Sequence, residues 1–197
     1  MKGTIEENKA AMDRLYPAWV PRTLWQQLLF CESQFSSRPF VIFDETTYSY
    51  REVKRQTIRY AQALRRCGVH AGSHVAVMLY NCPEFVYLIF AIAALGAVKI
   101  PMNPSLGEEE KRYFLQNADA DFLICRTAPF TAFSQASVQV LPLETLLSSC
   151  LVSESWPETV CDTCEADEDI LAQDPFSLCD IIFTSGSTSH PKGVMVT

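Results

Sequence analysis

The chain has 197 residues, of which 48% are hydrophobic, and a formal net charge of −7 at pH 7. This length fits one large domain or two small ones, and the apolar fraction is enough for a buried core, which excludes a disordered chain. The negative charge argues against nucleic acid as the main partner. The longest apolar run, residues 85–98, is shorter than the roughly 20 residues that span a bilayer, and the polar start carries no secretion signal. We therefore expect a cytoplasmic protein that does not cross a membrane.

Eight cysteines are spread along the chain, and in a cytoplasmic protein we expect them to be reduced. Only Cys161 and Cys164 form a C-x-x-C pair. A structural zinc site needs about four ligands, and neither a second pair nor a suitably spaced histidine completes one. The sequence therefore predicts no metal site, and a surface loop around this pair.

Composition divides the chain into four parts. Residues 1–19 form a polar leader, and residues 20–151 are predicted to form an α/β subdomain. Residues 152–174 contain an acidic stretch and are typical of a solvated connection rather than a binding device. Residues 175–197 contain a last strand and a hydroxyl-rich loop, which we interpret as the start of a second, truncated subdomain.

The first predicted elements of the α/β subdomain are a short helix, a hairpin and a longer helix. Thr23 is placed to cap a helix over 24–30, and the hairpin covers 40–49. Ser49 then opens the longer helix. Ser49 and Glu52 have the spacing of a capping box, in which each side chain bonds a free backbone N–H at the helix start.

Strands and helices alternate beyond this helix. Ser105 and Glu108 repeat the capping-box spacing ahead of a helix that ends near residue 118. The alternation, with short connections, favours a parallel sheet of βαβ units with helices on both faces, and ligands collect at the carboxyl ends of such strands. The predicted strands cover 74–79, 99–102, 121–125, 138–143 and 179–183, and the other predicted helices cover 84–97 and 144–151.

The last predicted strand runs into a loop rich in hydroxyl groups, where residues 184–193 read Thr-Ser-Gly-Ser-Thr-Ser-His-Pro-Lys-Gly. Phosphate oxygens need several convergent donors, which hydroxyls and backbone N–H groups supply. Gly186 and Gly193 allow the backbone a close approach, and Lys192 adds a point charge suited to phosphate. The sequence thus predicts a phosphate site made by Thr184, Ser185, Gly186, Ser187, Thr188, Ser189, Lys192 and Gly193.

This loop has two other possible interpretations, a simple turn and a Walker A loop. A loop of serine, threonine and glycine is most often only a turn, but here a lysine follows and a buried strand precedes it. A Walker A loop requires glycine before its lysine and a hydroxyl residue after it. Pro191 precedes Lys192 and Gly193 follows it, so a P-loop NTPase is excluded.

The loop resembles the T-S-G-[ST]-T-G-x-P-K-G signature of the adenylate-forming, AMP-binding superfamily. That group includes acyl-CoA synthetases, firefly-type luciferases and the adenylation domains of nonribosomal peptide synthetases. The match departs at Ser189, where glycine is usual, and serine there is similar to the form in crotonobetaine/carnitine-CoA ligases. The resemblance spans about residues 20–197, because other motifs of the superfamily are matched in the correct order at 47–52, 68–76, 81–85 and 96–104.

This resemblance implies an incomplete N-terminal portion of the large domain of an adenylate-forming enzyme. Such an enzyme joins a small carboxylic acid to ATP as an acyl-adenylate, releases pyrophosphate, and in synthetases transfers the acyl group to CoA. The implied cofactors are ATP, Mg²⁺ and CoA. The resemblance also implies that Thr184 to Lys192 hold the β- and γ-phosphates, with Lys192 as the catalytic residue.

The last residues, 194–197, read as part of a strand, so we expect a fragment that is inactive alone. Two other functions stay open at this point. One is an amino-acid adenylation domain that feeds a carrier protein. The other is a non-catalytic nucleotide-binding remnant.

Overall fold

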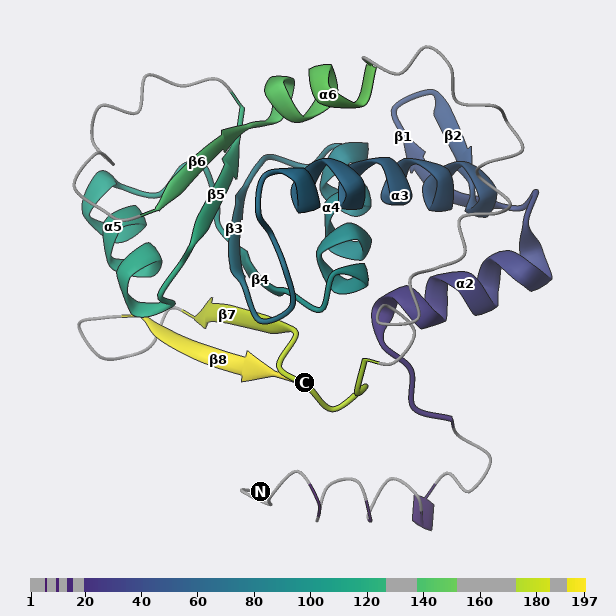
Figure 1. Ribbon diagram of the computed structural model, residues 1–197, viewed down its shortest axis with the longest axis horizontal. Helices are drawn as coiled ribbons and strands as arrows, with labels where there is room; N and C mark the ends of the chain where they lie inside the picture. The colour runs from purple at the N-terminus through teal and green to yellow at the C-terminus, as the bar shows by residue number, and fades with distance from the viewer. Residues whose placement is uncertain are drawn as a thin grey trace.

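A six-stranded sheet with helices packed against it forms most of the computed structural model (Figure 1). The structure describes residues 20–126, 138–151, 173–184 and 191–197, together with the isolated residues 6, 10, 14 and 15. The strands are β1 (Pro39–Phe43), β2 (Thr46–Ser49), β3 (His74–Met78), β4 (Val98–Pro101), β5 (Phe122–Cys125), β6 (Gln139–Pro142), β7 (Asp180–Thr184) and β8 (Lys192–Val196). The helices are α2 (Leu24–Phe35), α3 (Tyr50–Arg66), α4 (Pro83–Ala94), α5 (Glu108–Asn117) and α6 (Leu143–Leu151).

The sheet is mostly parallel, as the alternation of elements predicts. Its strand order is β6-β5-β3-β4-β7-β8, and every neighbouring pair is parallel except β7 and β8. β1 and β2 form a separate antiparallel hairpin. The predicted α/β class with βαβ units is therefore confirmed, with one antiparallel strand added at the edge.

Helices cover both faces of this sheet, because successive residues of a strand point to opposite faces. Val75 and Val77 of β3 belong to a core shared with buried residues of α2, α3, α4 and α6. Ala76 and Met78 of the same strand belong to a second core, with buried residues of α5. Helix α5 therefore lies on one face, while α3, α4 and α6 cover the other (Figure 1).

The long helix α3 begins as the sequence predicts. The amide of Glu52 donates to Ser49 Oγ at 3.3 Å, and the amide of Ser49 donates to Glu52 Oε2 at 2.7 Å. These reciprocal bonds satisfy two backbone donors that would otherwise have no partner. They also lower the pKa of Glu52, chiefly through the hydrogen bond from the Ser49 backbone.

Three predicted helix boundaries were wrong, and one of them is the end of α4, which lies at Ala94 rather than at residue 97. Helix α2 is capped by Thr23 as expected, but it continues to Phe35 rather than ending at residue 30. The capping box of α5 does not start at Ser105, because the amide of Ser105 donates to Asn103 Oδ1 at 2.9 Å in the preceding turn. Gly107 is the N-cap instead, and its amide donates to Glu110 Oε2 at 3.1 Å.

The last two strands join the same sheet as the rest. β7 lies beside β4, and β8 lies at the edge beside β7. The acidic connection was predicted over 152–174, of which only residues 173 and 174 are described. The division of the chain into subdomains stays a prediction.

Candidate functional site

Thr184 and Lys192 lie opposite each other at the loop end of the β7–β8 hairpin. They are direct partners in the antiparallel register, and both are exposed. Ile181 and Phe183 belong to the α5 side of the sheet, so the alternation of side chains places Thr184 and Lys192 on the opposite face. None of the ion pairs among the described residues involves Lys192. A hydroxyl and an ammonium group therefore lie together at the carboxyl end of β7.

The other predicted phosphate ligands divide into two groups. Ser185, Gly186, Ser187, Thr188 and Ser189 lie outside the described residues, so their part in the site stays a prediction. Gly193 is described, and it lies opposite Phe183 in the register. A Cβ atom at Gly193 would come within 3.2 Å of Ile181 Cγ2 and 3.5 Å of Phe183 Cε1. Close packing inside the hairpin is thus one reason for glycine at this position.

Helix α5 contacts the hairpin on both sides of the predicted loop. Phe114 stacks on Phe183, with ring centroids 4.1 Å apart and ring planes 11° apart. The hydroxyl of Tyr113 donates to the backbone carbonyl of Pro191 at 3.1 Å. One contact lies immediately before Thr184 and the other immediately before Lys192, so one helix holds both sides of the candidate site.

A nearly buried ion pair anchors β7 to β4 at the opposite end of the strand. Lys99 Nζ lies 3.2 Å from Asp180 Oδ2, and the two side chains are only 11% and 15% exposed. The backbone amide of Lys99 also donates to the carbonyl of Cys179 at 2.8 Å. Burial raises the pKa of Asp180 above its usual range, although the Lys99 ammonium acts in the opposite direction. The pair fixes where β7 starts, and therefore where Thr184 lies.

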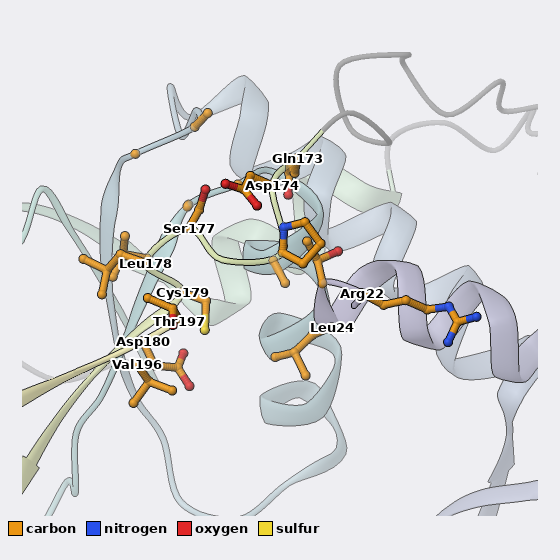
Figure 2. Close-up of a pocket in the computed structure, with 18 of the residues that line it drawn as sticks. Arg22, Leu24, Gln173, Asp174, Ser177, Leu178, Cys179, Asp180, Val196 and Thr197 are labelled. Carbon is orange, nitrogen blue, oxygen red and sulfur yellow. The ribbon is translucent and has the colours of Figure 1, made fainter. Parts of the chain in front are cut away.

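A cavity of about 630 Å³ lies at the amino ends of β3, β4 and β7, away from Thr184 and Lys192. Figure 2 shows Asp174 and Asp180 among the side chains that line it. Arg22 also lines it, but its guanidinium lies over the Phe30 ring, 4.2 Å from the centroid. Two carboxylates and an engaged arginine do not suit a polyphosphate, so this cavity is not the predicted phosphate site.

The described residues also bear on metal binding, membrane spanning and the state of the thiols. Among the described residues, no three His, Cys, Asp or Glu side chains are grouped so that they could hold a metal ion. No helix in the described ranges has the length and apolar character to cross a bilayer. The described cysteine thiols Cys31, Cys67, Cys82, Cys125 and Cys179 are free, as expected for reduced thiols, whereas Cys161 and Cys164 lie outside the described residues.

The family model of the AMP-binding enzymes matches residues 31–197. The chain belongs to this family. A crotonobetaine/carnitine–CoA ligase from Citrobacter koseri is 31% identical over 193 residues, which is 89% of this chain and 36% of the relative. One from Escherichia coli O1:K1 is 33% identical over 161 residues, covering 76% of this chain and 30% of the relative. The chain thus spans about a third of the length of these curated relatives.

Solved structures of AMP-binding enzymes share the fold. The N-terminal subdomain of NpsA from Klebsiella oxytoca aligns with a TM-score of 0.72 and 26% identity, over 90% of this chain and 42% of that chain. The o-succinylbenzoate CoA synthetase MenE from Bacillus subtilis aligns with a TM-score of 0.68 and 22% identity, over 88% of this chain and 42% of that chain. The recognition of the adenylate-forming superfamily from the sequence is therefore confirmed.

Three features of the site could not be found from the sequence. Tyr113 read only as part of a helix, and the partner of its hydroxyl lies 78 residues away. Lys99 and Asp180 read as strand residues. A charge inside a short apolar strand was the one available signal for their pairing, because such a charge needs a buried partner.

Proposed function

We propose that this chain forms part of an ATP-dependent acyl-CoA synthetase and supplies its site for the polyphosphate of ATP. The observation that carries the proposal is the pairing of Thr184 with Lys192 at the carboxyl end of β7, with Lys192 outside the ion pairs of the described residues. Membership of the AMP-binding family and similarity to CoA ligases support the same chemistry.

In the proposed reaction, a carboxylate oxygen of the acid attacks the α-phosphorus of ATP. The bond from that phosphorus to the bridging oxygen breaks, and pyrophosphate leaves with its electron pair. The CoA thiol then attacks the acyl carbon, loses its proton and displaces AMP. Negative charge builds up on the departing pyrophosphate, and Lys192 and Thr184 stabilise it with an ammonium group and a hydroxyl donor.

The predicted donors Ser185, Gly186, Ser187, Thr188, Ser189 and Gly193 complete the phosphate site in this proposal. Mg²⁺ is implied by the family resemblance, and the described residues contain no group of three His, Cys, Asp or Glu side chains that could hold it. The remaining parts of the enzyme, among them the acyl pocket and the contacts to adenine, lie in this proposal outside the 197 residues. The proposed location is the cytoplasm.

The test is acid-dependent exchange between ATP and labelled pyrophosphate by an intact enzyme that contains this chain. The acids to compare are crotonobetaine, carnitine, a fatty acid, an aryl acid and an amino acid. Exchange with one of them, followed by formation of its CoA thioester, is the expected result. Loading of a phosphopantetheine carrier instead of free CoA would assign an amino-acid adenylation domain.

The 197-residue chain alone is the matched control. We expect it to give no exchange, because it spans only about a third of the length of the curated relatives. Binding of ATP by the intact enzyme without exchange for any acid would contradict the proposal and leave a non-catalytic nucleotide-binding protein.

A further inference from the structure

Tyr113 holds the chain one residue before Lys192. Its hydroxyl donates a hydrogen bond of 3.1 Å to the carbonyl of Pro191. We propose that Tyr113 is a positioning residue that fixes the ammonium group of Lys192 for the polyphosphate of ATP without touching ATP itself. The inference rests on the proposed function and adds to it a residue that no motif of the loop contains.

Lys192 is the first residue of β8, and it is exposed. Among the described strands, β8 pairs with β7. A lysine side chain has a long and flexible stem, and the position of its charge depends on a backbone that is held in place.

Helix α5 supplies a rigid anchor for that backbone. Phe114 and Leu115 are 7% and 1% exposed and are packed in the core with Met78 and Ile100. Tyr113 precedes Phe114, so its ring is attached to an element that cannot shift without disturbing this core. Because the donor is already held in place, the hydrogen bond forms with little further loss of conformational entropy.

The same helix also restrains the chain before Thr184. The Phe114 ring stacks on Phe183 at 4.1 Å, and the Tyr113 ring meets Phe183 edge-on at 6.4 Å. Consecutive residues of α5 therefore fix the positions of the residue before Thr184 and the residue before Lys192. Pro191 has a fixed φ angle, which helps an anchored carbonyl to define the direction of the next residue.

The test compares Tyr113→Phe with wild type in the intact enzyme, using ATP–pyrophosphate exchange. Phenylalanine keeps the ring contacts and removes only the hydroxyl. We expect kcat for exchange to fall about 3- to 10-fold, the range for loss of one hydrogen bond, with the KM for ATP changed less than about 2-fold, because Lys192 acts on charge that develops as pyrophosphate leaves. The matched control is Tyr80→Phe, which removes a hydroxyl 3.1 Å from Ser105 Oγ and should leave both constants unchanged.

A double-mutant cycle with Lys192→Ala distinguishes positioning from general support of the fold. If Tyr113 acts through Lys192, then Tyr113→Phe should lower kcat by less than about 2-fold once Lys192 is alanine. Independent effects that multiply would overturn the inference. If the wild type is active and Tyr113→Phe has an unchanged kcat, this inference alone is overturned. A wild type without any exchange would remove the proposed function and this inference together.

Discussion

Lys99 and Asp180 form an ion pair of 3.2 Å that joins neighbouring strands β4 and β7 almost out of contact with water. Lys99 and Asp180 are also direct partners in the parallel register of these two strands. Four residues later, β7 ends at Thr184, where the candidate phosphate site begins. A buried pair at one end of the strand therefore sets the position of the site at the other end.

Removing one partner of this pair should lower the stability of the fold. Lys99→Met leaves the Asp180 carboxylate buried without its cation, and we expect the free energy of unfolding at pH 7 to fall by about 3 kcal/mol. The double variant Lys99→Met/Asp180→Leu should recover to within about 1 kcal/mol of wild type, because no buried charge then remains. Urea unfolding of the three proteins measures this, and a double variant as unstable as Lys99→Met would contradict it.

The loss in Lys99→Met should depend on pH, with a definite sign. The folded-state pKa of Asp180 is raised by burial, so its contribution to stability is fully present below its unfolded pKa of about 3.9 and is lost as the pH rises through the folded value. Removal of the Lys99 ammonium raises that pKa further. The gap in stability between wild type and Lys99→Met should therefore shrink as the pH falls from 7 to 5. A gap that widens on acidification would show that the carboxylate is not the destabilising group.

Ser49→Ala should lower the free energy of unfolding by about 1 kcal/mol, since it removes the side chain that caps α3. Ser33→Ala is a suitable control, because the exposed Ser33 hydroxyl donates to the carbonyl of Phe30 and accepts from Gln34 Nε2 without capping a helix start, and its effect should stay within about 0.5 kcal/mol. The pKa of Glu52 is lowered in the folded state, so its contribution is present above the unfolded pKa and is lost as the pH falls through the folded value. Equal losses in both alanine variants would argue against the capping role.

Gly193→Ala tests whether packing requires glycine at the end of the signature. The new Cβ would lie 3.2 Å from Ile181 Cγ2, so the hairpin must move, and we expect a loss of about 1 kcal/mol or more. Thermal unfolding of Gly193→Ala and wild type measures the difference. A Gly193→Ala protein as stable as wild type would leave phosphate binding as the reason for the glycine.

Local signals in the sequence predicted the elements of this fold well. The signals for the Ser49–Glu52 capping box and for the apolar strand around Val75 each lie within a few residues of the chain. The structure has both features where they were predicted. The start of α5 was missed because Ser105 is engaged by Asn103, a competing turn that the spacing does not reveal. Contacts between distant segments, such as Tyr113 with Pro191 and Lys99 with Asp180, could not be predicted, because they depend on strand order and on how helices lie across the sheet.

The proposed role of Lys192 in adenylation is tested most directly by measuring the two half-reactions separately in the intact enzyme. With Lys192→Ala, formation of the acyl-adenylate from ATP should slow about 100- to 1,000-fold, the range for loss of one preorganised donor to a developing charge. Transfer of preformed acyl-adenylate to CoA should change less than about 3-fold, because pyrophosphate has already left. Equal slowing of both half-reactions would contradict a role for Lys192 in holding the polyphosphate.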